Sequence, residues 1–327
     1  MDRSYTGAAL VVCAMAWSGV AAADAGEGGE KTPRFVTFTL DNDLFAGGDS
    51  HYTDGLQLAF VVDRTSLPGW MNDSPPVRWS ADPAVMLAVG QRMYTPTNTH
   101  TAHPDPNDRP YAGWLYFLMD VMTRNDSAVD HATFSLGVIG PPSLVKQAQQ
   151  DIHHLVHSGM SEGWDSQLGT EPALMLGYER AWPGLVRAES GHWDVTPRAG
   201  ATIGNVLTYA NAGFVARWGR NLPSDAPVTH ISLGPPRDGY RGTTATGWYA
   251  WVGADVRAVA RNIFLDGNTW KDGPSVDRKP FGCDIEAGFA ITWPRGRLGF
   301  TYVRRSDEFR TQQHPDRFGQ LTLSLPY

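Results

Sequence analysis

The sequence predicts an all-β protein, an antiparallel transmembrane β-barrel of about twelve strands with a short helix in one loop region. The chain ends on Leu321, Leu323, Leu325 and Tyr327, which alternate with polar or small residues and so lie on one face of a strand. A final strand that ends on an aromatic residue is typical of bacterial outer-membrane barrels. The 35 glycines and 12 tryptophans suit tight turns and aromatic girdles at a membrane interface.

The N-terminal segment predicts export from the cytoplasm. An apolar run at residues 8–20 is followed by three alanines, which offer an A-x-A cleavage site before Asp24. The run is too short and too rich in small residues to cross about 30 Å of hydrocarbon as a helix. We therefore expect a signal peptide over 1–23 and one barrel domain over 24–327, located in the bacterial outer membrane.

The cysteines and the net charge limit the remaining possibilities. Cys13 does not indicate a lipoprotein, because Val12 precedes it where a small residue is required, and its removal with the signal leaves Cys283 alone. An intrachain disulfide is therefore not expected. The net charge of −7 argues against nucleic acid as a partner, and no break in composition divides the chain.

Runs of alternating or β-rich composition, separated by clusters of Pro, Asn, Asp and Gly, give the expected strands. They cover residues 34–40, 56–62, 85–94, 112–123, 132–139, 173–179, 193–203, 213–218, 247–257, 285–293, 297–304 and 321–327. A tilted strand needs about ten residues to cross a bilayer; the longer segments reach that length, and the shortest, 213–218, has six residues.

One helix is expected, at 142–157. Gln149, His153 and His157 follow each other at intervals of four and share one face of it, while apolar residues cover another. A helix that interrupts an all-β chain is expected to act as a plug or to direct its side chains at a ligand.

A set of polar and aromatic motifs runs along the chain in order. They are Asp41-Asn42-Asp43, Tyr52-Thr53-Asp54-Gly55, Tyr94-Thr95-Pro96, Asp108-Arg109-Pro110-Tyr111-Ala112-Gly113-Trp114, Val138-Ile139-Gly140-Pro141, Gly163-Trp164-Asp165-Ser166-Gln167-Leu168, Glu171-Pro172 and Arg261-Asn262-Ile263-Phe264-Leu265-Asp266-Gly267-Asn268. The ordered set resembles the lipid A deacylase family of outer-membrane proteins (lipid A 3′-O-deacylase) and spans nearly the whole mature chain.

The resemblance implies a twelve-stranded barrel and a calcium-dependent hydrolase that removes ester-linked 3′ acyl chains from the lipid A of lipopolysaccharide. It implies catalytic positions at His153, Gln149, Asn42 and Thr53. It also implies Ca²⁺ as the cofactor, with Asp43, Asn42 and Thr53 as the metal ligands. We expect the protein to act as a monomer.

The chemistry of these residue types is compatible with ester hydrolysis, which needs a water nucleophile, a base and positive charge beside the developing oxyanion. His153 suits the base, since the unperturbed pKa of histidine is about 6.5. Asn42 and Asp43 offer hard oxygen ligands for calcium, and Thr53 adds another or positions a water. Gln149 is placed to orient the water or the substrate.

Three other motif interpretations are weaker. Gly48-Asp49-Ser50 resembles the start of a GDS-type serine esterase, but that class needs a helix after the serine and a strand is expected here. Asp41-Asn42-Asp43 lacks the glycine and glutamate that an EF-hand loop requires at its sixth and twelfth positions. The histidines at 153, 154 and 157 have no matching partner that would indicate zinc.

Two alternative functions stay open. A barrel lipase similar to outer-membrane phospholipase A would use a serine nucleophile, for which Ser50 is the candidate. A barrel with a structural or transport role would keep these residues without the activity. Asp108 and Arg109 are expected to form a buried ion pair beside a rigid proline turn rather than to act in catalysis.

Overall fold

The computed structural model describes residues 34–46, 51–63, 67–73, 83–125, 127–156, 161–223, 233–237 and 240–327. The side chains of residues 44, 46, 51–53, 63 and 152–156 lie outside this description, as does the expected signal peptide. The strands of the described residues are β1 (Phe35–Asn42), β2 (His51–Asp63), β3 (Ala84–Thr95), β4 (Ala112–Arg124), β5 (Val129–Ile139), β6 (Glu171–Ala181), β7 (Val186–Arg187), β8 (Trp193–Gly204), β9 (Leu207–Arg220), β10 (Gly247–Asn262), β11 (Phe281–Trp293), β12 (Gly296–Arg305) and β13 (Asp316–Pro326).

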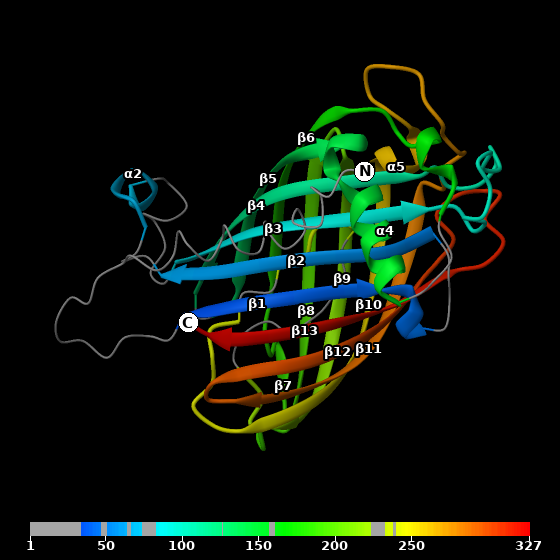
Figure 1. The fold of residues 1–327 in the computed structure, drawn as a ribbon. Coiled ribbons are helices and arrows are strands. Elements are labelled where there is room, and N and C mark those ends of the chain that lie inside the picture. The colour runs from blue at the N-terminus through cyan, green and yellow to red at the C-terminus, as the bar shows by residue number, and fades with distance from the viewer. Residues whose placement is uncertain are drawn as a thin grey trace.

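These strands form one antiparallel sheet that closes into a barrel (Figure 1). Each long strand pairs with its neighbours in sequence, and β1 pairs with β13 from Phe35 opposite Pro326 to Asn42 opposite Gly319. The ring is completed by β6 pairing with β8, because the two-residue β7 only extends the β6–β8 connection. Closure leaves no long strand with an unpaired edge.

The predicted barrel of about twelve strands is confirmed. Every predicted strand corresponds to one of the twelve long strands, and the two-residue β7 is the one that alternation did not predict. The strand ends are less well predicted, since β9 begins at Leu207 rather than at 213 and β13 begins at Asp316 rather than at 321.

The wall is polar inside and apolar outside. On β1 the inward Thr37, Thr39 and Asp41 are 1–2 % exposed, whereas the outward Phe38 is 37 % exposed. The terminal strand shows the same alternation, with Thr322 and Ser324 buried and Leu325 41 % exposed. This pattern, with lipid outside and a polar interior, is the one that transmembrane barrels require.

Short helices occupy the connections, and most lie at one end of the barrel. They are η1 (Asp43–Ala46), α2 (Gly69–Asn72), η3 (Pro141–Ser143), α4 (Val145–Val156), η4 (Gly163–Ser166) and α5 (Ile263–Asp266). Figure 1 shows α4 and α5 at the right-hand end, here called the loop end, and α2 and the C-terminus at the opposite end, the terminus end. Among the described residues no helix is long and apolar enough to cross a membrane.

Part of the β9–β10 connection lies inside the barrel. Leu233 and Tyr240 are 4 % and 0 % exposed, and the Pro236 carbonyl accepts a hydrogen bond of 3.0 Å from the Gln57 amide on the inner wall. Arg237 forms an ion pair of 2.8 Å with Glu179. The interior of the barrel is therefore filled by side chains of the wall and by part of the β9–β10 connection.

Candidate active site

Asn42, the predicted site residue of β1, lies on the outer side of the barrel wall together with Asp54 of β2. Strand register places Asn42 opposite Asp54, Asp54 opposite Met93, and Met93 opposite Gly113. The alternation of each strand directs these residues outward, because Asp41 and Arg92 beside them are buried on the inner side. Four adjacent strands thus contribute one row, which we call the site row, at the loop end of the outer wall.

Asp43 follows directly from β1 and begins η1. Its side chain is 2 % exposed, while that of Asn42 is half-buried. The turn folds over the outer face of β13, where a Cβ at Gly319 would lie 2.6 Å from the Cβ of Phe45. Glycine at 319 therefore lets η1 approach the wall and hold Asp43 beside the site row.

Thr53 is the extra residue of a β-bulge. Tyr52 pairs with Tyr94 and Asp54 pairs with Met93, so Thr53 has no opposite residue on β3. A bulge bends its strand and redirects a side chain, and such bulges are common beside active sites. The Thr53 side chain lies outside the described residues, so its expected ligand role stays a prediction.

Helix α4 packs against the outer face of β3 and β4. Its N-terminal Val145 lies in a buried cluster with Met93, Tyr111 and Trp164. Gly113 permits this contact, since a Cβ there would lie 2.9 Å from the Cβ of Val145. The expected helix at 142–157 is present, but it begins as the turn η3 and α4 starts only after Leu144, which has a φ of 60°.

Gln149 is held by an indole. It is 4 % exposed, and its Oε1 accepts a hydrogen bond of 2.6 Å from Nε1 of Trp164 in η4. Because an indole nitrogen can only donate, this bond fixes the orientation of the amide and leaves Nε2 as its donor end. Trp164 is 1 % exposed and its ring lies 4.9 Å from that of Tyr111, so the indole itself is rigidly packed.

The backbone of His153 lies one helical turn after Gln149 in α4. Its side chain, and that of His154, lie outside the described residues, as does the whole of His157. The structure thus brings Asn42, Asp43 and the Thr53 backbone together, while the expected base role of His153 stays a prediction.

Arg109 connects the loops above the barrel. Its guanidinium forms an ion pair of 2.5 Å with Glu308 in the β12–β13 connection, and both side chains are buried. The expected pair with Asp108 is wrong: the Asp108 carboxylate instead accepts hydrogen bonds from the backbone amides of Thr97 (2.8 Å) and Arg109 (2.7 Å). Adjacent positions favour such local caps, whereas the longer arginine side chain reaches across to another loop.

The electrostatics of Glu308 follow from this pairing. Burial acts to raise the pKa of its carboxyl, but Arg109, Arg305 and Arg257 together hold the pKa below its usual value. Glu308 is therefore ionised at neutral pH and anchors the β3–β4 and β12–β13 connections to each other.

A second anchor joins the connection after α4 to the one that contains α5. Glu171 accepts hydrogen bonds from the Asn268 side chain (2.9 Å), from the Thr269 hydroxyl (2.6 Å) and from the Thr269 backbone amide (2.8 Å). Asn268 also donates to the Gly169 carbonyl over 2.8 Å. The motifs Glu171-Pro172 and 261–268 thus serve to brace the loop end.

The donor set of the site row suits a hard cation. Oδ1 of Asp54 is buried and has no hydrogen-bond partner among the described residues, and Asp54 lies directly opposite Asn42. Together with Asp43 these residues offer carboxylate and amide oxygens, the ligands that calcium prefers. In the described part of the chain no three His, Cys, Asp or Glu side chains gather, so amide or hydroxyl oxygens would have to complete a site.

Sequence reasoning missed Asp54, Trp164 and Glu308 as contributors. The first two stood inside recognised motifs without an assigned role, and only the register and the indole contact reveal one. Glu308 lies outside the motifs, and 199 positions separate it from Arg109.

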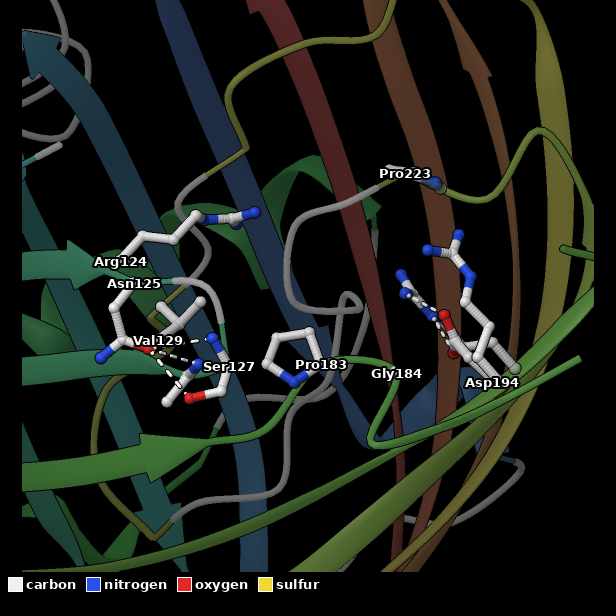
Figure 2. Close-up of a pocket in the computed structure, with 11 residues that line it drawn as sticks. Arg124, Asn125, Ser127, Val129, Pro183, Gly184, Asp194 and Pro223 are labelled. Carbon is white, nitrogen blue, oxygen red and sulfur yellow. Dashed lines mark hydrogen bonds and ion pairs between the residues drawn. The ribbon is translucent and has the colours of Figure 1, made fainter. Parts of the chain in front are cut away.

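A cavity of about 180 Å³ lies elsewhere, at the terminus end (Figure 2). Its lining includes Arg124, Asn125 and Pro183, and Arg217, whose Nε and Nη2 donate to the Asp194 carboxylate over 2.9 and 2.7 Å. None of the predicted site residues lines it. The buried ion pair there is already satisfied, so the cavity is not the candidate site.

Comparison with known proteins agrees with this architecture. A family model for the outer membrane protein LpxR matches residues 8–327. Among solved structures, LpxR from Salmonella typhimurium is similar in fold, with a TM-score of 0.73 at 16% identity over 90% of this chain and 100% of that one. The beta domain of the Bordetella autotransporter BrkA gives a TM-score of 0.42 at 10% identity, over 90% of this chain and 99% of that one. No curated protein sequence matches the chain. The chain belongs to the LpxR family of outer membrane proteins, and its barrel lies in the outer membrane.

Proposed function

We propose that this protein is an outer-membrane hydrolase that removes ester-linked 3′ acyl chains from the lipid A of lipopolysaccharide. The observation that carries the proposal is the position of the site row on the outer wall, with Asn42 and Asp54 facing away from the filled interior. A substrate whose acyl chains stay in the bilayer reaches such a site from the side, without passing through the barrel.

The outward residues of β1 fit this substrate in depth. Val36, Phe38 and Leu40 are apolar and suit contact with acyl chains, and Asn42 is the next outward residue. With a rise of about 3.3 Å per residue, Asn42 lies about 7 Å beyond Leu40. The change from apolar to polar marks the edge of the hydrocarbon, which is where the ester bonds of a lipid lie.

His153 is the proposed general base. It lies one turn from Gln149 in a helix that packs on the wall, and a neutral imidazole there can take a proton from a water molecule as that water attacks the ester. Gln149 donates from Nε2 to the ester carbonyl and to the oxyanion that forms from it, because Trp164 occupies its oxygen. Asn42, Asp43, Thr53 and Asp54 would hold calcium, whose charge polarises the carbonyl when it is bound.

The decisive experiment is mass spectrometry of lipid A from cells with and without the protein. Loss of one 3′ acyl chain, or of a 3′ acyloxyacyl group, supports the reaction, and unchanged lipid A refutes it. His153→Ala should abolish this change in lipid A. The variant barrel should still be folded, as shown by a shift in its gel mobility on heating. His154→Ala is the matched control. Ser50→Ala should retain activity. A loss of activity in Ser50→Ala would favour the serine-dependent lipase.

Calcium dependence is tested separately on purified protein. EGTA should remove activity, and calcium should restore it better than magnesium, because flexible carboxylate and amide ligands suit the larger ion. Full activity after exhaustive chelation would contradict a calcium role.

A further inference from the structure

Two arginines face each other on the outer surface at the loop end. Arg304 of β12 and Arg317 of β13 are direct cross-strand partners, and both side chains are exposed. Their neighbours Arg305 and Asp316 point into the barrel and are 2 % and 0 % exposed. The alternation of both strands therefore directs Arg304 and Arg317 toward the lipid side.

Exposed charge is rare on this wall. Among strand residues whose side chains are described, the exposed charged residues are Arg187, Arg220, Arg304 and Arg317, with no exposed carboxylate. Arg187 and Arg220 lie at the terminus end. At the loop end, exposed strand charge is thus confined to one pair of like sign.

The nearby carboxylates have other partners. Asp307 forms an ion pair of 3.1 Å with Lys279, and Asp277 forms one of 2.6 Å with Arg310. Neither Arg304 nor Arg317 forms an ion pair with a residue that the structure describes. The two positive charges are therefore left to repel each other.

Directly opposed like charges destabilise a strand pair. An anion between two guanidinium groups would turn that repulsion into attraction, and phosphate matches the guanidinium fork in geometry. We propose that Arg304 and Arg317 bind a phosphate group on the sugar headgroup of the lipid substrate. The inference rests on the proposed function for the identity of that lipid.

The pair lies beside the site row. Gly319, which η1 covers, is the next outward residue after Arg317 on β13, and two residues of a strand span about 7 Å. The Phe45 ring of η1 lies 6.2 Å from that of Phe300 on β12. Figure 1 shows the turn after β1 beside the start of β13. In lipid A the 4′ phosphate is attached to the carbon next to the 3′ ester, so one headgroup spans both sites.

The position of Arg304 along the bilayer normal also fits contact with a headgroup phosphate. On β12 the outward residues are Leu298, Phe300 and Tyr302, followed by Arg304. An apolar stretch that ends in an aromatic residue and then an arginine is the order in which hydrocarbon, interface and headgroup phosphate are met in a bilayer.

Lipid binding tests the proposal without catalysis. Wild type, the double variant Arg304→Gln/Arg317→Gln and the control Arg187→Gln/Arg220→Gln would be titrated in maltoside micelles with bisphosphorylated lipid A and with 4′-dephosphorylated lipid A. Native mass spectrometry would report bound lipid. We expect the double variant to bind bisphosphorylated lipid A about tenfold or more weakly, and the dephosphorylated lipid as wild type does.

Three results would overturn the site: no difference between the two lipids, an equal loss with both, or an equal loss in the control. Binding of inorganic phosphate with no preference between the lipids would assign the pair to a free anion and reject the lipid. Hydrolysis is measured in parallel, so an inactive wild type that still discriminates the lipids refutes the reaction but not the phosphate site.

Discussion

Replacement of Trp164 by phenylalanine tests how Gln149 acts. The change keeps a ring beside Tyr111 and removes the N–H that donates to Oε1 of Gln149 over 2.6 Å. Both side chains are at least 96 % buried, so the freed oxygen loses its partner without full access to water. An unsatisfied buried acceptor costs about 1–3 kcal/mol, and the amide relieves that cost by rotating.

The size of the effect on rate follows from that cost. Rotation of the amide misplaces Nε2, so the turnover number of Trp164→Phe should fall by about 10-fold to 100-fold, since 1.4 kcal/mol corresponds to a factor of about ten. Removing the donor altogether with Gln149→Met should cost about 10²–10³-fold, as loss of one oxyanion donor does. The double variant Trp164→Phe/Gln149→Met should have the same turnover number as Gln149→Met, because on this hypothesis Trp164 acts only through Gln149.

Gln149→Glu separates two roles of this side chain. It keeps an acceptor for the Trp164 indole but has no N–H to give, so a donor role predicts a loss as large as that of Gln149→Met. If Gln149 instead accepts a hydrogen bond from the attacking water, Gln149→Glu should stay active. Tyr111→Phe is the matched control, because it removes one polar group from the same cluster, a hydroxyl 3.4 Å from the Thr99 carbonyl.

The assay is release of fatty acid from lipid A in micelles, with kcat and KM determined separately. Loss of an interaction that is stronger with the oxyanion than with the bound ester lowers kcat more than it raises KM. Near-normal turnover of Gln149→Glu in a folded barrel would refute the donor role of Gln149. If Tyr111→Phe lowered turnover as much as Trp164→Phe, both losses would be explained by altered packing of the cluster.

Three further results are expected. Glu308→Gln should lower the unfolding temperature at pH 7 and make that temperature less dependent on pH in the acid range. Burial raises the pKa of Glu308 but Arg109 more than offsets it, so the carboxylate stabilises the fold above its unfolded pKa of about 4.3, and that contribution is lost as the pH falls through the lower folded value. An unchanged dependence of the unfolding temperature on pH would exclude the Arg109–Glu308 ion pair as an anchor. Gly113→Val should displace α4 and abolish deacylation while heat-modifiable mobility persists, and retained activity would show that the helix tolerates a Cβ there. Asp54→Ala should raise the calcium concentration for half-maximal activity at least as much as Asn42→Ala, and an unchanged calcium requirement would remove Asp54 from the donor set.

The alternation of the strands was enough to predict the barrel. A closed wall between lipid and a polar interior forces a period of two on every strand, and that period is visible in segments such as 321–327. The bulge at Thr53 was not predictable, because an extra residue leaves the composition of β2 unchanged and shifts only its pairing with β3.

The site was predictable in part for a similar reason. Asn42 ends β1 and Asp43 begins the turn after it, and the motifs around them resemble the family, so their position next to β2 follows from sequence order. The contact of Gln149 with Trp164 depends on how the connection after α4 folds back on the helix, and the pairing of Arg109 depends on a loop 199 positions away. Long-range contacts of this kind leave no local pattern.

The filled interior and the polar outer row together constrain the mechanism. Inside the barrel, Arg257 and Arg305 both donate to Asp284, over 2.7 and 2.8 Å, so two buried guanidinium groups share one carboxylate. Outside, the site row offers Asp54 with an oxygen that no described residue satisfies, and beyond it lie Arg304 and Arg317, which form no ion pair with a described residue. A polar group without a partner is costly where water is scarce, and a ligand that binds it removes that cost. If the proposed function holds, a lipid that carries an ester and a phosphate on adjacent carbons would complete both groups at once, and it would approach them from the lipid side of the wall.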